Sequence, residues 1–417
     1  MKVLVVGGGG REHAICTSLK KSKRITQLYC APGNGGISEI AECVDIPATD
    51  IDAMTRFAKE NGIDFVMVAP DDPLALGMVD AMEAAGIRAF GPHKNAAVIE
   101  SSKVFSKDLM AKYNIPTAKY EVFTEAEKAI AYIREQGAPI VVKADGLALG
   151  KGVVVAADIE TAEDAVWSMM RDNKFGNSGA RVVIEECMTG PEVTVLAFTD
   201  GKTVKPMLSS QDHKRAFDND IGPNTGGMGA FCPSPKYTSE IAEVCMDTIF
   251  KPTIDAMNSE GRPFKGVIYF GLMLTPNGPR VIEYNARFGD PEAQAVLLML
   301  KTDLLDIFDA IIDEKLAEID IEWNDGFSCC VVMASGGYPE KYDKGIEITG
   351  FENVPGDITV FHAGTQKNGG KYHTNGGRVL GVTALGDSLP DAARRAYDGV
   401  ALISFENAHF RTDIGKK

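Results

Sequence analysis

A carboxylate, an amide and a guanidinium alternate along one short segment, Val281 to Glu292, which reads Val-Ile-Glu-Tyr-Asn-Ala-Arg-Phe-Gly-Asp-Pro-Glu. Side chains of a strand alternate between its faces, so Glu283, Asn285 and Arg287 are predicted to project together, with apolar residues opposite. Mg²⁺ takes few carboxylate ligands together with phosphate oxygens, and arginine neutralises the phosphate charge that the metal leaves. The segment therefore suits metal-assisted phosphate chemistry. The alternative is an edge strand with a solvated face.

A glycine-rich loop at residues 145–152 reads Asp-Gly-Leu-Ala-Leu-Gly-Lys-Gly. It is not a Walker A loop, because the glycine spacing is one residue short, Gly152 replaces the metal-binding Ser or Thr, and a Val-Val-Val strand follows. A glycine loop between two strands can instead cover phosphates with its amides, and Lys143 would reach the same phosphates. A plain flexible turn remains the alternative.

A strand, a turn and a second strand follow at residues 183–195. Glu192, just after the turn, could accept both hydroxyls of a ribose. The main chain from Glu185 to Met188 could pair with an adenine edge. An ordinary hairpin is the alternative here.

The elements that must position these residues belong to a chain of 417 residues, 45% hydrophobic and 24% charged, which predicts a soluble globular protein of roughly two to four domains. The net charge of -15 disfavours nonspecific binding to nucleic acid or membrane. No window approaches ~18 uncharged apolar residues, and the start runs directly into a strand, so we expect a cytoplasmic protein. The eight cysteines lack zinc spacing and indicate reduced thiols.

The first hundred residues alternate apolar strands with helical stretches, including one helix at 74–85, which predicts a parallel sheet flanked by helices. Ligands of such sheets bind at the carboxyl ends of the strands, where Gly9, Asn34 and Asp71 lie. The glycines from Gly7 lack the spacing of a dinucleotide fingerprint, so an NAD site is excluded. Phosphate or sugar binding by these loops and simple turn chemistry both remain open.

Helices and strands continue to about residue 319, and short strands with one helix follow. We therefore expect an N-terminal α/β domain, a central domain containing a mobile lid, and a small C-terminal domain. Their predicted ranges are 1–100, 101–319 with the lid at about 118–188, and 320–417.

The order of these pieces, from Lys103 through Lys143 and its glycine loop to Glu192 and Glu283-x-Asn285-x-Arg287, resembles the ATP-grasp superfamily. Within it the chain is most similar to the phosphoribosylamine-glycine ligase (glycinamide ribonucleotide synthetase) family. That resemblance implies an α/β and α+β multidomain fold, with an ATP-grasp domain between a Rossmann-like parallel α/β domain and a small α+β domain. The matching segments run the full length of the chain: 7–14, 32–36, 142–148, 211–215, 222–230, 287–292, 375–381 and 411–415.

The resemblance also assigns roles to individual residues. ATP-binding residues would be Lys103, Lys143, Gly146, Gly150, Gly152, Glu185, Glu186, Met188 and Glu192. Metal ligands for Mg²⁺ or Mn²⁺ would be Glu283 and Asn285. Catalytic residues would be Arg287, Lys143, Asp212 and Lys214. Substrate-binding residues would be Gly9, Asn34, Asp71, Asp212, Arg215, Asp290, Gly377 and Arg378, although Arg378 could equally be a solvated turn residue.

The implied reaction is ligation of glycine to 5-phosphoribosylamine in purine biosynthesis, through glycyl phosphate, with release of ADP and phosphate. Small molecules would be the only partners, and we expect a monomer or a weak homodimer. Two features depart from the family pattern: Asp71 follows Ala-Pro where Gly-Pro-Glu is usual, and Val267 to Leu274 offers no acidic ligand for a second metal. The alternatives are a formate-using or biotin-dependent relative, which the loop from Asp212 to Met228 disfavours, and a nucleotide-binding regulator without turnover, which the intact site residues disfavour.

Overall fold

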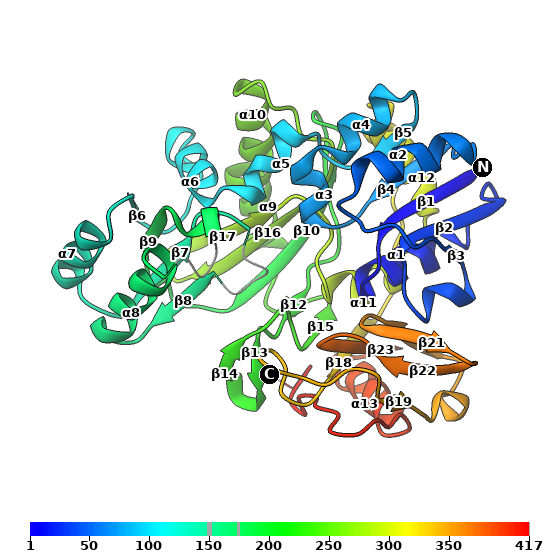
Figure 1. Ribbon diagram of the computed structural model, residues 1–417. Coiled ribbons are helices and arrows are strands. Elements are labelled where there is room, and N and C mark those ends of the chain that lie inside the picture. The colour runs from blue at the N-terminus through cyan, green and yellow to red at the C-terminus, as the bar shows by residue number, and fades with distance from the viewer. Residues whose placement is uncertain (148–151, 173–175, 417) are drawn as a thin grey trace.

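The chain begins with a five-stranded parallel sheet, as the alternation of strands and helices predicts (Figure 1). The structure is a computed structural model that describes residues 1–147, 152–172 and 176–416. The strand order is β3-β2-β1-β4-β5, so the order reverses direction at β1. The carboxyl ends of β1, β2 and β4 therefore lie along one edge of the sheet. The strands are β1 (Lys2–Gly7), β2 (Gln27–Pro32), β3 (Glu42–Cys43), β4 (Phe65–Val68) and β5 (Arg88–Phe90).

Helices from two parts of the chain cover this sheet. One face packs on α2 (Ile51–Glu60) and α4 (Met78–Ala84), and the other on α1 (Gly10–Leu19) and the much later α12 (Leu304–Ile312). Phe308 of α12 stacks on Phe90 with 3.8 Å between ring centroids. The single helix predicted at 74–85 is wrong: it is divided into α3 (Asp71–Leu76) and α4, because Gly77 adopts φ +98°, a left-handed conformation that ends α3.

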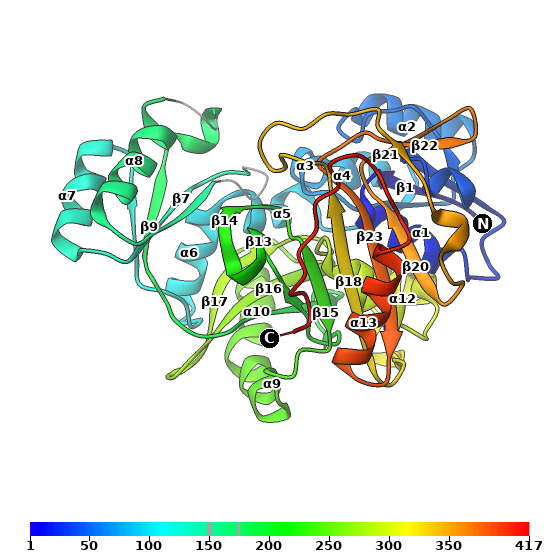
Figure 2. The same cartoon turned by 90° about the horizontal axis from the view of Figure 1, so that it is seen from below.

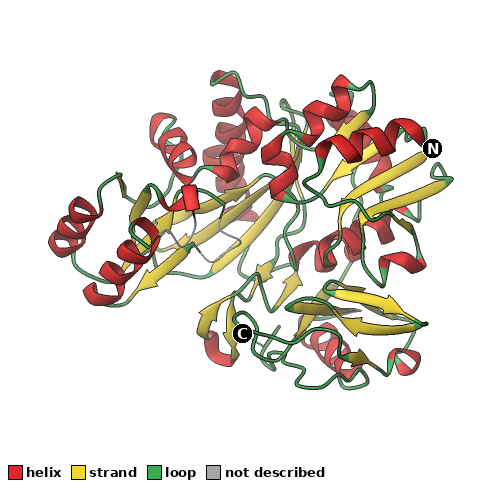
Figure 3. Cartoon of the chain, viewed as in Figure 1, coloured by secondary structure: helices red, strands yellow, loops and turns green. Residues whose placement is uncertain are grey.

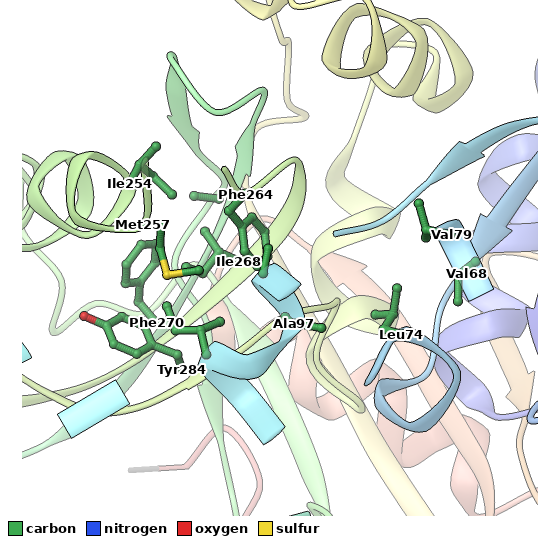
Figure 4. Packing of buried hydrophobic residues seen from close by; sticks show 14 of the residues in the cluster. Val68, Leu74, Val79, Ala97, Ile254, Met257, Phe264, Ile268, Phe270 and Tyr284 are labelled. Carbon is green, nitrogen blue, oxygen red and sulfur yellow. The ribbon is translucent and has the colours of Figure 1, made fainter. Parts of the chain in front are cut away.

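A four-stranded antiparallel sheet, ordered β11-β10-β16-β17, lies at the centre of the molecule. Its strands are β10 (Glu192–Thr199), β11 (Val204–Pro206), β16 (Gly266–Thr275) and β17 (Gly278–Asn285), and α9 (Ser239–Cys245) and α10 (Lys251–Ser259) cover one face. Figure 4 shows Ile254 and Met257 of α10 packed beside Phe270 and Tyr284. Strand β17 is an edge strand, and a bulge opposite Gly271 and Leu272 shifts its register just before Glu283.

A second four-stranded sheet, ordered β6-β9-β7-β8, projects from this centre with α7 and α8 on one face (Figure 2). Its elements are β6 (Tyr120–Phe123), α7 (Ala126–Gln136), β7 (Ile140–Ala144), β8 (Val153–Ala156), α8 (Ile159–Met170) and β9 (Val182–Glu186). Strands β7 and β8 pair across the glycine loop, which confirms the predicted strand-loop-strand arrangement. Strand β9 does not pair with β10, so the hairpin alternative for residues 183–195 is wrong; this segment joins two different sheets.

The C-terminal sheet, ordered β12-β15-β18-β23-β20, takes two strands from the middle of the chain. Figure 3, in the view of Figure 1, shows the strands of this region in yellow and the helices in red. The two strands from the middle of the chain are β12 (Gln211–Asp212) and β15 (Gly229–Cys232), between which the hairpin of β13 (Arg215–Phe217) and β14 (Ile221–Asn224) protrudes. The other elements are β18 (Phe327–Ala334), β20 (Ile358–His362), β23 (Arg378–Gly386) and α13 (Leu389–Val400), beside a small sheet of β19 (Glu347–Ile348), β21 (Thr365–Asn368) and β22 (Lys371–Thr374). Strand β15 is thus held against β18, which lies far later in the chain.

None of the helices in residues 1–147, 152–172 and 176–416 has the length and apolarity needed to cross a membrane.

Two buried imidazoles join the first and last parts of the chain. His13 Nδ1 accepts a hydrogen bond of 2.8 Å from the main-chain N–H of His362, and the rings lie 5.7 Å apart. Burial lowers the pKa of His13 to about 4 and that of His362 to about 3. The contact between α1 and β20 therefore requires neutral imidazoles.

We expect this contact to make the fold sensitive to acid. The unfolded chain binds these protons more readily, so the stability is complete above about pH 6.5 and is lost as the pH falls toward 4. Protonation of His13 alone should lower the free energy of unfolding by about 2 kcal/mol by pH 5. Urea unfolding at pH 8 and pH 5 should show that His13→Asn loses less free energy of unfolding between these pH values than the wild-type protein, because the Asn amide oxygen can still accept the His362 N–H. Equal losses in both proteins would contradict the assignment.

Candidate active site

Two buried lysines share one buried glutamate between the projecting sheet and helix α6 (Lys103–Lys112). Glu185 Oε1 lies 2.9 Å from Lys143 Nζ, and Glu185 Oε2 lies 3.0 Å from Lys107 Nζ. Burial lowers the pKa of Lys107 to about 8, although the Glu185 carboxylate acts in the opposite direction. Lys143 Nζ also donates to Ile282 O on β17 at 3.0 Å. The arrangement brings Lys143 to the strand that carries Glu283.

The start of α6 is tied to the glycine loop. Asp145 Oδ1 accepts the Val104 N–H at 2.8 Å and the Ser102 hydroxyl at 2.9 Å, so this carboxylate caps the helix from another sheet. Lys103 Nζ donates to Gly146 O at 3.0 Å. Burial lowers the pKa of Lys103. Lys103 and Lys143 therefore converge beside the loop, as predicted, while Gly150 lies outside the described residues.

Lys214 occupies the space between two carboxylates. Its Nζ lies 3.2 Å from Glu283 Oε1 and 3.4 Å from Glu192 Oε2. Lys214 lowers the pKa of Glu283 to about 2 despite burial, and Lys143 and Lys103 add to this effect. Glu283 is therefore an anion at every ordinary pH, with its charge directed at cations.

Asn285 and Arg287 lie together beyond the bulge in β17. Arg287 Nη2 donates to Asn285 Oδ1 at 3.3 Å and pairs with Glu100 Oε1 at 3.0 Å. Burial disfavours the charge, but the Glu100 and Asp71 carboxylates raise the pKa of Arg287. The buried Arg287 Nε–H has no acceptor among the described residues. The predicted alternation holds from Glu283 onward, because Tyr284 and Ala286 are buried. It is wrong at Ile282, which is only half-buried, because the bulge interrupts the strand there.

Two further carboxylates lie in the same region without an ion pair in the described part of the chain. Asp212 Oδ1 accepts the His213 N–H at 2.6 Å, and Glu292 Oε1 accepts the Thr194 hydroxyl at 3.4 Å. Burial raises the pKa of Asp212 well above its ordinary value, and the Glu292 charge adds to the effect. Such a pair is suited to receive a cationic or hydrogen-bond-donating group.

An aspartate–arginine cluster, defined by Asp290, Gln294 and Arg378, joins the middle and last parts of the chain at this site. Arg378 Nη1 donates to Gly226 O and to Asp290 O, both at 2.7 Å, and Nη2 lies 3.4 Å from Asp290 Oδ1. Gln294 Nε2 donates to the same Oδ1 at 2.9 Å. Arg378 is therefore a half-buried residue that holds the loop at Gly226, and the solvated-turn alternative is excluded.

The loops of the first sheet meet this cluster at its edge. The Arg11 N–H donates to Asp290 Oδ2 at 3.4 Å, next to Gly9, whose own N–H donates to Glu12. Asn34 Nδ2 donates to Gly8 O at 3.0 Å and to His362 O at 2.8 Å, so its amide crosslinks the loops. Gly9 and Asn34 thus lie where the sequence predicts, although Asn34 already uses its polar atoms.

The remaining predicted residues are spread around the site. Glu186 Oε1 pairs with Arg280 at 3.1 Å on the approach from β9, and Glu192 is exposed. The Gly152 carbonyl accepts the Ala144 N–H at 2.8 Å. The Arg215 guanidinium donates to Gly222 O at 2.8 Å inside the β13–β14 hairpin and contacts none of the other predicted site residues in the described chain. Met188 is half-buried in the connection to β10, and a Cβ at Gly377 would clash with Tyr338.

Sequence reasoning missed four residues that the structure brings to the site: Lys107, Glu100, Glu292 and Gln294. Lys107 had a usable signal, because it lies one helical turn after Lys103 and shares its face. Glu100 lies in the last turn of a short helix, α5 (Lys94–Ser101), and shows no pattern of its own. The positions of these residues follow from tertiary packing.

This donor set fits a phosphate-bearing ligand with a divalent cation. Lys214, Lys143 and Lys103 surround Glu283, and Arg287 donates to Asn285, so two oxygen donors of one strand lie among cationic groups. The buried Arg287 Nε–H has no acceptor among the described residues, an unfavourable state that a bound anion would relieve. The fold, with its projecting antiparallel sheet facing β16 and β17 across the lysines, is an ATP-grasp fold, and the predicted fold class is confirmed.

The chain belongs to the phosphoribosylglycinamide synthetase family. The N domain of that family matches residues 1–100, the ATP-grasp (A) domain residues 101–293 and the C domain residues 328–417. The phosphoribosylamine–glycine ligase of Caldanaerobacter subterraneus subsp. tengcongensis is 48% identical over 414 residues, 99% of each chain. That of Vibrio parahaemolyticus is 49% identical over 419 residues, covering 100% of this chain and 98% of its own.

Solved structures agree with this assignment. The crystal structure of phosphoribosylamine–glycine ligase from Thermotoga maritima matches with a TM-score of 0.84 and 31% identity, covering 99% of this chain and 100% of its own. Biotin carboxylase from Campylobacter jejuni, in complex with an ATP analogue, matches with a TM-score of 0.76 over 98% of this chain and 92% of its own, at 14% identity. The second likeness shows the shared fold alone.

The shared glutamate yields a prediction about stability. Glu185→Gln leaves two buried ammonium groups without their carboxylate and should lower the free energy of unfolding by about 3–5 kcal/mol. Lys107→Met leaves the Glu185–Lys143 pair intact and should lower it less, by about 1–2 kcal/mol. Urea unfolding of both variants measures this order. A larger loss for Lys107→Met would contradict the shared-carboxylate geometry.

Proposed function

We propose that this protein ligates glycine to 5-phosphoribosylamine, giving glycinamide ribonucleotide, ADP and phosphate. The full-length similarity to phosphoribosylamine–glycine ligases supports this function. The observation that carries it is that Lys103, Lys143 and Lys214 surround Glu283, on the strand that also carries Asn285 and leads to Arg287. These are the charges needed to bind a nucleoside triphosphate and to transfer its terminal phosphoryl group.

In this proposal, Lys103 and Lys143 bind the phosphates of ATP, with Gly146, Gly150 and Gly152 in the covering loop. Glu192 accepts the ribose hydroxyls, and the segment from Glu185 to Met188 borders the adenine. The Glu185 side chain also has a structural task, since it compensates two lysines.

Glu283 and Asn285 are the proposed ligands of Mg²⁺ or Mn²⁺, which would shield the phosphate charges during transfer. Lys214, now paired with Glu283, would exchange that contact for the phosphoryl oxygens when the nucleotide binds. Arg287 would stabilise the phosphoryl group in transit, since its buried Nε–H has no acceptor among the described residues.

The glycine carboxylate attacks the γ-phosphorus, the bond to the ADP oxygen breaks, and glycyl phosphate forms. The amine of phosphoribosylamine then attacks the acyl carbon, expels phosphate and loses a proton. Asp212 and Glu292 are placed to receive donor groups of these substrates, and no protein nucleophile is required.

The sugar phosphate is proposed to lie between the loops at Gly9, Asn34 and Asp71 and the Asp290–Arg378 pair, with Gly377 beside it. Arg215 remains a weaker candidate, because its guanidinium is used inside its own hairpin.

We further propose three domains, 1–100, 101–319 and 320–417, a mobile lid at about 118–188, a cytoplasmic location and a monomer or weak homodimer. Three elements cross these boundaries in space: β12 and β15 join the last sheet, and α12 packs on the first.

An ADP-release assay tests the function. Phosphoribosylamine is generated in situ, and glycine, formate or bicarbonate is omitted in turn. Turnover should require glycine and be indifferent to the other two. Dependence on formate or bicarbonate would overturn the proposal in favour of another ATP-grasp ligase, and nucleotide binding without turnover in favour of a regulator.

Glu283→Gln should lower kcat by several orders of magnitude while leaving the fold intact. The change removes one ligand charge, which is worth several kcal/mol of transition-state stabilisation, about 4 or more. Steady-state turnover at saturating Mg²⁺ measures it, with circular dichroism as the check on folding. An unchanged rate would show that Glu283 is not a metal ligand.

Arg378→Ala should raise the KM for phosphoribosylamine by about tenfold or more, because a charged hydrogen bond of roughly 1.5–3 kcal/mol is lost. The KM values for ATP and glycine should change little. Arg378→Lys keeps the charge but loses the bidentate geometry of the guanidinium, so its KM for phosphoribosylamine should lie between those of the wild type and Arg378→Ala. A rise in the ATP constant instead would assign Arg378 to the nucleotide site.

A further inference from the structure

Glu100 makes a buried contact with Arg287 to which no role has been assigned. It lies in the last turn of α5, shortly before α6 begins, and its side chain reaches Arg287, just after the end of β17. Only 8% of the residue is exposed. Two elements far apart in the sequence therefore meet through one carboxylate.

Both oxygens of that carboxylate are used, and each orients a different part of the same segment. Oε2 accepts the Ala286 N–H at 2.7 Å, which holds the main chain directly before Arg287. Oε1 lies 3.0 Å from Arg287 Nη2, which holds the guanidinium itself. The other acceptors are weaker: Asn285 Oδ1 is 3.3 Å from Nη2, and Phe288 O lies 3.1 Å from Nη1. Without Glu100, only neutral acceptors hold this long, rotatable side chain.

These contacts leave one hydrogen-bond donor of the Arg287 guanidinium without an acceptor. Arg287 Nε–H is buried and has no acceptor in the described residues, although an unpaired buried donor is unfavourable. A cationic donor kept unpaired suits an anion that arrives later.

We propose that Glu100 is a positioning residue, which holds the Arg287 guanidinium so that its Nε–H faces the phosphoryl group in transit. The role rests on the proposed function, in which Arg287 contacts that group. Glu100 itself does not touch the substrates. Preorganised donors of this kind accelerate phosphoryl transfer because they need no rearrangement in the transition state.

Steady-state ADP release by Glu100→Gln and Glu100→Asp tests the proposal. Glu100→Gln should lower kcat by about tenfold or more while changing the KM for ATP by less than about threefold, and Glu100→Asp, which keeps the charge, should retain more activity. Asp309→Asn is the control, since it weakens arginine pairs on α12 and should leave turnover near wild type. Thermal unfolding confirms that each variant is folded.

Rescue by free guanidinium ion separates positioning from a purely structural role. Guanidinium chloride should restore part of the activity of Arg287→Ala in a saturable manner, and should fail to do so in Arg287→Ala combined with Glu100→Gln. Unchanged kcat in Glu100→Gln, equal rescue in both backgrounds, or no rescue with Glu100 present would each overturn the role. Absence of glycine-dependent ADP release in the wild type would instead overturn the proposed function itself, and the role with it.

Discussion

Charge compensation among buried side chains is the constraint on which the rest of this structure depends. Three lysines, Lys103, Lys107 and Lys143, are withdrawn from water within one region, and each would be unfavourable alone. Glu185 offsets two of them, and Glu283 faces a fourth lysine, Lys214. The charges of these lysines and glutamates therefore offset one another within the described structure.

This arrangement requires that the elements carrying the charges be fixed relative to one another. Asp145 caps α6 from the projecting sheet, and Lys143 donates to the main chain of β17. Glu100 joins the end of α5 to Arg287. The central lysines are thus located by contacts between three elements, and none of those contacts is local in sequence.

A second set of long-range contacts encloses the opposite side of the site. The imidazole of His13 accepts a main-chain hydrogen bond from β20, and Asn34 bonds to the same region. Arg378 reaches back to Asp290 and to the loop at Gly226. Residues from the first, middle and last parts of the chain therefore lie together on this side of the site. No single continuous loop supplies them.

The sequence by itself determined what depends on local periodicity and residue chemistry: the parallel sheet, the strand-loop-strand at 145–152, the alternation that groups Glu283 with Asn285, and the family. It did not determine the break at Gly77 or the separation of β9 from β10, because strand partners are chosen by packing. Lys107, Glu100 and Glu292 enter the site only through tertiary structure, since a buried charge takes its partner from whichever element packs against it. The physical reason is that burial and ion pairing act between segments distant in the chain, and no local pattern encodes that distance.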